Sequence, residues 1–129
     1  MKTALSILIA EDDWLTSEVI NRFVAKKFPG VNIYSAANGS IGLKLFKAHT
    51  PDIVITDINM PVMDGIRMAG EIKATKSDTK FIVLTAYTGD ESYLDSFSEI
   101  GFIDYLPKPI EFEKLYAAIE KCFEEIEPK

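Results

Sequence analysis

The sequence contains one cysteine, one histidine and no basic run longer than Lys26-Lys27. Cys122 has no partner for an internal disulfide, so we expect it to be buried and to act as a small apolar residue. A single cysteine also suits a protein of a reducing compartment. The net charge of −6 argues against nucleic acid or anionic lipid as a direct partner. The short apolar stretch at the N-terminus is ended by Glu11 and fits neither a signal peptide nor a membrane span. We therefore expect the protein in the cytoplasm.

What is present has the composition of an ordinary globular domain. Of the 129 residues, 47% are hydrophobic and 26% are charged, which is far from a disordered composition. A chain of this length is the commonest size of one domain and can bury about two-thirds of its unfolded surface. No repeat, low-complexity tract or linker is visible. We expect a single domain over residues 1–129, with its core over about residues 5–126.

Short apolar segments alternate with helical periodicities five times along the chain. The apolar segments are rich in Ile and Val and are predicted to be buried strands; they cover residues 5–10, 31–36, 52–56, 80–85 and 102–106. Amphipathic helices are predicted between them, including one over 14–28 and one over 110–126. In the first, one face carries Leu15, Val19, Phe23 and Val24. This alternation predicts a parallel sheet with helices on both faces, a doubly wound (βα)5 fold of the α/β class.

Polar residues suited to metal and phosphoryl chemistry follow four of the predicted strands. They are Glu11, Asp12, Asp57, Thr85 and Lys108. In an open parallel sheet, ligands bind beyond the carboxyl ends of the strands, where the strand order reverses. Two carboxylates about 4 Å apart repel each other by about 4 kcal/mol at an effective dielectric of about 20. We therefore expect a divalent cation among the acids, beside a phosphoryl group.

Other residues near this site receive structural interpretations. Asp13, directly before Trp14, is predicted to be the N-cap of the first helix. Asp64-Gly65 is interpreted as a loop turn that leads into the third helix. His49 is predicted to cap the C-terminal end of its helix, and Trp14 is expected at the surface.

Four segments together resemble the receiver domains of two-component response regulators. They are ILIAEDD at residues 7–13, DINMPVMDG at 57–65, LTA at 84–86 and YLPKP at 105–109. The resemblance covers essentially the whole chain, and the four segments stand in order at the spacing of the family. It implies the flavodoxin-like arrangement of the doubly wound fold, with five parallel strands in the order 2-1-3-4-5.

The resemblance implies that Asp57 is the phosphoacceptor. Its carboxylate would receive a phosphoryl group from a phosphohistidine on a sensor histidine kinase or a phosphotransfer protein, giving an acyl phosphate. The resemblance also implies Mg²⁺, for which Mn²⁺ could substitute. The metal would be held by Asp12, Asp57 and the backbone carbonyl of Asn59, with Glu11 acting through a water. An octahedral site of oxygen ligands with one or two carboxylates suits Mg²⁺.

Further residues receive roles around the phosphoryl group by the same resemblance. Lys108 and Thr85 complete the catalytic set by contacting phosphoryl oxygens. Ala86 is small and leaves the approach open, and Tyr87 flanks the site. The peptide bond between Lys108 and Pro109 is expected to be cis.

The signal is expected to leave through Thr85 and Tyr105, which would act as a two-state switch. The surface that it changes would be the fourth helix, the fifth strand and the fifth helix, at about residues 90–126, where a partner or an output domain would bind. The chain would catalyse only its own phosphorylation and slow autodephosphorylation, and we do not expect a metabolic enzyme.

Three other classes of protein share parts of this pattern. A flavodoxin-like mononucleotide binder would place a Gly/Ser/Thr loop after the first strand, but that loop is acidic here. A Mg²⁺-dependent aspartyl-phosphate hydrolase would carry its nucleophile after the first strand and would have a cap region. A receiver-like interaction module that acts without phosphorylation is the third alternative, and the complete set of metal and phosphoryl residues disfavours it.

Overall fold

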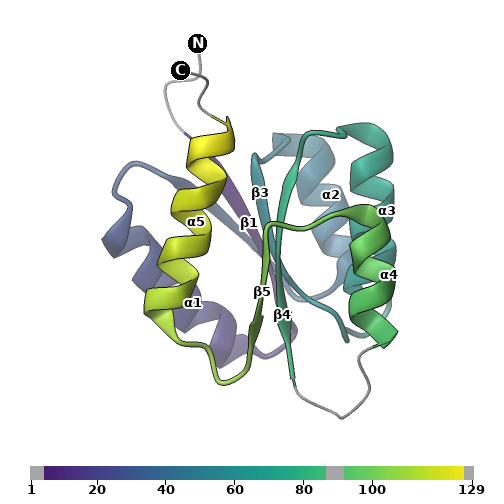
Figure 1. Cartoon of the computed structure of the whole chain (residues 1–129), viewed down its shortest axis with the longest axis horizontal. Helices are drawn as coiled ribbons and strands as arrows, with labels where there is room; N and C mark the ends of the chain where they lie inside the picture. The colour runs from purple at the N-terminus through teal and green to yellow at the C-terminus, as the bar shows by residue number, and fades with distance from the viewer. Residues whose placement is uncertain (1–4, 87–91, 127–129) are drawn as a thin grey trace.

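The computed structural model describes residues 5–86 and 92–126. Within these ranges, strands and helices alternate strictly along the chain (Figure 1). The strands are β1 Ser6–Ala10, β2 Asn32–Ala36, β3 Ile53–Asp57, β4 Lys80–Thr85 and β5 Asp104–Pro107. The helices are α1 Trp14–Lys27, α2 Gly39–His49, α3 Gly65–Thr75, α4 Ser92–Ile100 and α5 Phe112–Ile126.

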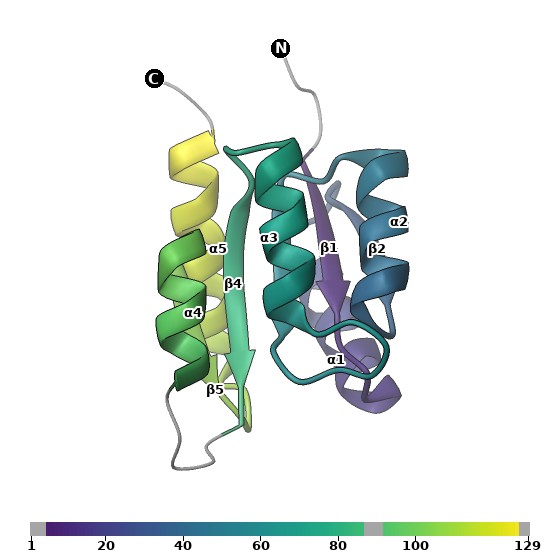
Figure 2. The same ribbon diagram turned by 90° about the vertical axis from the view of Figure 1, so that its right-hand side faces the viewer.

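The five strands form one parallel sheet in the order β2-β1-β3-β4-β5. Helices α1 and α5 cover one face, and α2, α3 and α4 cover the other (Figures 1 and 2). The predicted doubly wound fold and strand order are confirmed. The order reverses between β1 and β3, so the crevice at the carboxyl ends of these two strands is the expected ligand site.

The core consists of two apolar layers, one on each face of the sheet. Successive side chains of a strand point to opposite faces, so Ile7 and Ile9 of β1 pack with α1 and α5, whereas Leu8 and Ala10 pack with α2 and α3. Every residue of β1 and β3 is buried. The residues that follow β1 and β3 at their carboxyl ends therefore extend from fully buried strands.

The prediction of five buried strands is wrong for β2 and β5. Asn32 and Ser35 of β2 are exposed, and so are Tyr105 and Pro107 of β5. Both strands lie at the edges of the sheet, where a strand has a neighbour on only one side. Apolar composition alone does not distinguish an edge strand from a central one.

The face predicted for the first helix is also partly wrong. Helix α1 buries Ser17, Ile20 and Val24, whereas Leu15 is 61% exposed and Phe23 is 46% exposed. The apolar residues of α1 thus cover two arcs, and the sheet contacts only one of them. The other arc forms a surface with α5.

The ends of the helices follow local capping rules. Asp13 is the N-cap of α1, as predicted, and accepts a hydrogen bond from the backbone N–H of Thr16 at 3.0 Å. Asp64 caps α3 in the same way through the N–H of Arg67 at 2.8 Å. The prediction for His49 is wrong, because the C-cap of α2 is Thr50 in a left-handed conformation.

The ring of His49 instead stacks on Tyr34 of β2, with 4.1 Å between the ring centres. Two further structural expectations are confirmed, since Trp14 is 74% exposed and Cys122 is fully buried. A search of residues 5–86 and 92–126 finds no helix with the length and apolar character needed to cross a bilayer.

Candidate functional site

Strand register brings residues distant in the sequence together at one end of the sheet, where the strands have their carboxyl ends. Ala10 of β1 lies opposite Thr56 of β3, so the residues that follow them, Glu11 and Asp57, are neighbours. Lys108 follows directly after β5, and its backbone N–H donates to the carbonyl of Thr85 at the end of β4, at 2.8 Å. The carboxyl ends of four strands thus contribute to one site.

Three carboxylates lie together at this end of the sheet. One carboxylate oxygen each from Glu11, Asp12 and Asp57 lies within 4.8 Å of the others. Glu11 and Asp57 are only 2% and 8% exposed, whereas Asp12 is exposed to solvent. An all-oxygen acidic cluster with one solvent-facing member fits a hard divalent cation that keeps part of its water shell. The residues present therefore fit the expected Mg²⁺.

Lys108 supplies the positive charge that the two buried carboxylates require. Its Nζ lies 2.6 Å from Oε1 of Glu11 and 2.8 Å from Oδ2 of Asp57, and the lysine side chain is 24% exposed. The peptide bond between Lys108 and Pro109 is cis, as expected. The ammonium therefore lies directly beside the carboxylate of Asp57.

Burial and pairing compete in the electrostatics of this cluster. Burial raises the pKa of the Glu11 carboxyl above its ordinary value, and the ion pair with Lys108 and the hydrogen bond from the N–H of Asp13 only partly offset this effect. Burial also disfavours the charge on Lys108, but its hydrogen bond to Asp57 and its ion pair with Glu11 outweigh burial and raise the pKa of the lysine. The site thus favours a positive group beside the two acids.

The carboxylate of Asp57 is held in a defined orientation. Its Oδ1 accepts a hydrogen bond from the N–H of Ile58 at 2.7 Å, while Oδ2 faces Lys108. The backbone around it is closely packed, because a Cβ added to Gly65 would lie 2.1 Å from the carbonyl oxygen of Asp57. The hydroxyl of Thr56 donates to the same carbonyl at 2.7 Å. The side chain therefore extends from a rigid turn.

Two of these supporting groups were missed in the sequence. Gly65 was interpreted only as part of a turn, and its close approach to Asp57 has no signature in a single sequence. Thr56 looked like an ordinary strand residue. The neighbouring Asp13 supports the cluster as well, because its N–H donates to Oε2 of Glu11 at 3.0 Å.

The remaining predicted residues lie on β4, on β5 and in the loops that follow β3 and β4. Thr85 ends β4, and its hydroxyl donates to the carbonyl of Ala86 at 3.3 Å. Tyr105 is 46% exposed, and its ring meets that of Phe102 edge to face at 6.1 Å. Asn59 is exposed in the loop after β3. Tyr87 lies outside the described residues.

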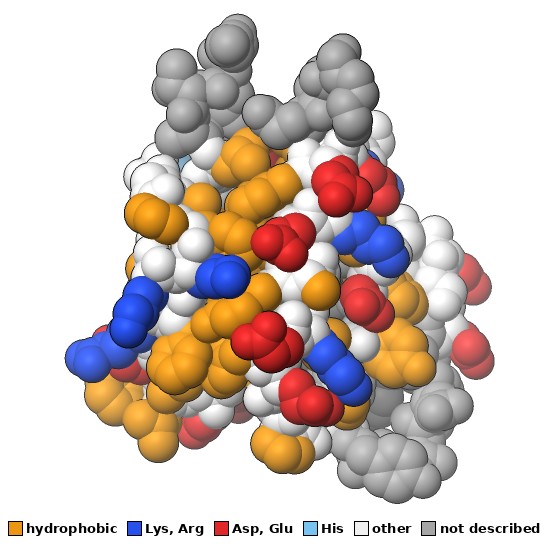
Figure 3. Space-filling view, turned by 60° about the vertical axis from the view of Figure 1, so that its left-hand side comes forward, with side chains coloured by type: hydrophobic (Ala, Val, Ile, Leu, Met, Phe, Trp, Pro, Cys, Tyr) orange, Lys and Arg blue, Asp and Glu red, His pale blue; other side chains and the backbone are white. Residues whose placement is uncertain are grey.

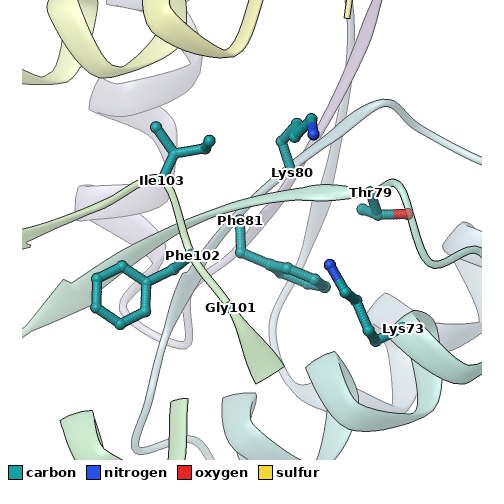
Figure 4. A pocket seen from close by; sticks show the side chains of 7 residues that line it. All are labelled: Lys73, Thr79, Lys80, Phe81, Gly101, Phe102 and Ile103. Atoms are coloured by element: carbon teal, nitrogen blue, oxygen red, sulfur yellow. The ribbon is translucent and has the colours of Figure 1, made fainter. Parts of the chain in front are cut away.

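A separate hollow of about 180 Å³ opens at the opposite end of the sheet, where β4 begins (Figure 4). It contains none of the acids of the cluster, and its lining consists of Lys73, Thr79, Lys80, Phe81, Gly101, Phe102 and Ile103. The acidic cluster at the carboxyl ends of β1 and β3 is therefore the candidate site.

Comparison with known families agrees with this geometry. The family described as the response regulator receiver domain matches residues 7–120. The chain belongs to the response regulator receiver family. This receiver domain is 34% identical over 120 residues to the probable C4-dicarboxylate response regulator DctR of Priestia megaterium, a match that covers 93% of the chain and 52% of that protein. It spans about half the length of the curated relatives it matches first.

Solved structures show the same fold. The N-terminal domain of an uncharacterized protein from Wolinella succinogenes is 37% identical, with a TM-score of 0.86 over 92% of the receiver domain and 94% of that chain. A CheY-like receiver domain protein from Methanospirillum hungatei has a TM-score of 0.87 over 95% of the receiver domain and 96% of that chain. At 22% identity, the second likeness concerns the fold alone.

Proposed function

We propose that this receiver domain accepts a phosphoryl group on Asp57 from a phosphohistidine of a sensor histidine kinase or a phosphotransfer protein. The observation that carries the proposal is the position of Lys108, whose Nζ lies 2.8 Å from Oδ2 of Asp57 at the edge of a three-carboxylate cluster. A structural ion pair alone would not require two further acids, one buried and one exposed, at the same point. A centre that handles metal and phosphate requires all of them.

Each side chain has a definite task in this proposal. Asp57 attacks the phosphorus, and Ile58 fixes the orientation of its carboxylate through the hydrogen bond to Oδ1. Lys108 would neutralise charge on a phosphoryl oxygen and the Thr85 hydroxyl would donate a hydrogen bond to another, which is most of what phosphoryl transfer requires of a protein. Ala86 leaves the approach open because its side chain is small.

The chain offers suitable ligands for Mg²⁺, or for Mn²⁺ in its place. Asp12, Asp57 and the backbone carbonyl of Asn59 would bind the ion, and Glu11 would orient one of its waters. When bound, the ion supplies positive charge beside the transferred phosphoryl group. The same residues would support slow autodephosphorylation, and we propose no metabolic reaction.

We propose that phosphorylation is transmitted to a partner through Thr85 and Tyr105. Thr85 would turn toward the phosphoryl group, and Tyr105, which is half-exposed, would rotate in response. This would change the surface formed by α4, β5 and α5, where a partner or an output domain would bind. The net charge of −6 favours a protein partner over direct contact with nucleic acid. We propose the cytoplasm as the compartment.

The proposal is tested by incubating the protein with Mg²⁺ and acetyl phosphate and measuring the intact mass. The wild-type chain should gain one phosphoryl group, and Asp57→Asn should gain none. Asp64→Asn is the matched control, because Asp64 lies in the same loop but caps α3, and Asn caps a helix as well as Asp does. Equal labelling of Asp57→Asn would show that the acceptor is another residue, and no labelling of the wild type would favour an interaction module that acts without phosphorylation.

A further inference from the structure

Among the polar residues of 5–86 and 92–126, Thr56 is the most deeply buried, with no exposed surface. Its register partners in the neighbouring strands are Ala10 of β1 and Val83 of β4, both of which are apolar. Burying a hydroxyl in such surroundings is unfavourable unless it forms a hydrogen bond. Valine has nearly the same shape and is favoured in buried strands. What distinguishes Thr56 from a valine at this position is therefore the hydrogen bond that its hydroxyl makes.

The hydroxyl of Thr56 donates to the backbone carbonyl of Asp57 at 2.7 Å. That carbonyl belongs to the peptide unit between Asp57 and Ile58, and the N–H of the same unit donates to Oδ1 of Asp57 at 2.7 Å. A peptide unit is planar, and in the trans form, as here, its carbonyl and its N–H point in opposite directions. Rotation of this unit would therefore break both hydrogen bonds together. The hydroxyl of Thr56 is thus linked to the carboxylate of Asp57 through one rigid peptide unit.

Gly65 confines the same peptide unit from the side of α3. A Cβ added to Gly65 would lie 2.1 Å from the carbonyl oxygen of Asp57 and 2.9 Å from the hydroxyl oxygen of Thr56. The N–H of Gly65 donates to the carbonyl of Ile58 at 2.8 Å. Thr56, two residues after Val54, lies on the face of the sheet that α2 and α3 cover, away from the apolar surface of α1 and α5 in Figure 3. The hydroxyl therefore lies where the end of β3 meets the start of α3.

We propose that Thr56 is a positioning residue for the phosphorylation of Asp57, an inference that rests on the function proposed above. Its hydroxyl fixes the peptide unit that follows Asp57, and the N–H of that unit fixes the plane of the attacking carboxylate. Thr56 is fully buried and does not reach a phosphodonor, so it acts only through the backbone. A hydrogen bond to a carbonyl also polarises the N–H of the same peptide unit, which strengthens the hydrogen bond from Ile58 to Oδ1.

The orientation of this carboxylate matters because phosphoryl transfer requires the attacking and leaving oxygens to be roughly in line. Lys108 holds Oδ2 at 2.8 Å, and Ile58 holds Oδ1 at 2.7 Å. The ammonium of Lys108 lies at the end of a flexible side chain, and in the proposed reaction it also contacts the phosphoryl group. The N–H of Ile58 has no such second task and holds Oδ1 throughout the transfer. The group that fixes this N–H therefore contributes to the rate.

The test compares Thr56→Val, which removes the hydroxyl, with Thr56→Ser, which keeps it. Thr79→Val is the matched control. Thr79 is 2% exposed, and its hydroxyl also donates to a backbone carbonyl, that of Lys76 at 2.9 Å, but it precedes β4 at the opposite end of the sheet. Both valine variants lose one buried hydroxyl bonded to a carbonyl, so urea unfolding should show similar losses of stability.

The first readout is the rate of phosphorylation by acetyl phosphate at saturating Mg²⁺, followed by intact mass. The maximal rate should fall about fivefold in Thr56→Val, which is the rate equivalent of one net hydrogen bond. The concentration of acetyl phosphate that gives half the maximal rate should not change, because Thr56 does not contact the donor. Thr56→Ser should restore the rate, and Thr79→Val should keep it.

The second readout is the amide proton of Ile58 in the NMR spectrum of the metal-free protein, which requires no phosphodonor. A hydrogen bond to a carboxylate is short and strong, so this proton should resonate at high frequency in the wild type. It should move to lower frequency in Thr56→Val, return in Thr56→Ser and stay unchanged in Thr79→Val. A purely structural role of Thr56 would lower stability without moving this resonance selectively.

Three results would overturn the positioning role while leaving the proposed function intact. They are a wild-type rate in Thr56→Val, an equal loss of rate in Thr79→Val, and a slower Thr56→Val in which the amide proton of Ile58 has not moved. The second would show that lost stability alone lowers the rate, and the third would exclude the route through the peptide unit. A wild type that takes up no phosphoryl group would instead overturn the proposed function, and the positioning role with it.

Discussion

Replacing Lys108 by Met should expose how strongly the acidic cluster depends on its one internal cation. Met keeps most of the apolar stem and removes only the charge. The ammonium lies 2.6 Å from Glu11, whose side chain is fully buried, and 2.8 Å from Asp57, whose side chain is 11% exposed. Without Lys108, both carboxylates would remain buried with no opposite charge beside them.

The expected cost follows from that geometry. Breaking a buried ion pair by removing one partner costs about 3–5 kcal/mol, and we expect about 3 kcal/mol because Lys108 is partly exposed. With a urea m-value of about 1.5–2 kcal/mol/M, the unfolding midpoint should fall by about 1.5–2 M. The assay is urea unfolding at neutral pH in the presence of EDTA.

Lys80→Met is the matched control. The side chain of Lys80 is 23% exposed, nearly the same fraction as the 24% of Lys108. Its partner Glu125, however, is 49% exposed and lies 3.5 Å away. An ion pair of this kind contributes about 0–1 kcal/mol. Both variants lose a lysine. The difference between their losses of stability therefore measures the effect of leaving buried acids without a positive charge.

Two further measurements test the cause of the loss. Because the pKa of Glu11 is raised by burial, a Glu11 without Lys108 takes up a proton as pH falls toward its ordinary pKa of 4.5, and the deficit should shrink in that range. Mg²⁺ should also restore more stability to Lys108→Met than to wild type. Equal costs for Lys108→Met and Lys80→Met, or a deficit that grows on acidification, would refute the reasoning.

Three other predictions concern the metal, the loop after β3 and the thiol. Mg²⁺ at about ten times its Kd should stabilise the wild type by about 1.4 kcal/mol in urea unfolding, and an equal gain in Asp12→Asn would contradict the ligand assignment. Gly65→Ala should lower stability by more than about 2 kcal/mol, because its Cβ would lie 2.1 Å from the carbonyl oxygen of Asp57. Gly70→Ala should instead raise thermal stability by about 0.5–1 kcal/mol, since nothing lies within 4 Å of its Cβ. Burial raises the pKa of Cys122 to about 12, so a thiol reagent at about pH 8 should label it only after unfolding, and rapid labelling of the native protein would contradict the burial.

Local features of the sequence were predicted most accurately. The position of β4 was correct at both ends, and Asp13 was correctly predicted as the N-cap of α1. The strand is recognised from its own apolar composition, and the cap depends on a hydrogen bond between residues close in the chain, from Thr16 to Asp13. The prediction for His49 failed because its ring finds a partner in Tyr34, on a different element.

The first helix shows where periodicity stops being informative. Its apolar residues form two arcs, and the sequence favoured the one containing Leu15 and Phe23. The sheet instead buries Ser17 and Ile20. A periodic pattern states that a helix has an apolar face, but the neighbouring elements decide which face is covered.

The sequence by itself determined the alternation of strands and helices, the parallel sheet and the strand ends at which the acids, the threonine and the lysine would lie. These follow from local periodicity and from the rule that ligands meet the carboxyl ends of parallel strands. Only the tertiary structure decided that Lys108 pairs with both Glu11 and Asp57, that Gly65 presses against the backbone of Asp57, and that part of α1 stays exposed. Distances between residues on different elements depend on how the strands and helices pack, and no local pattern encodes them.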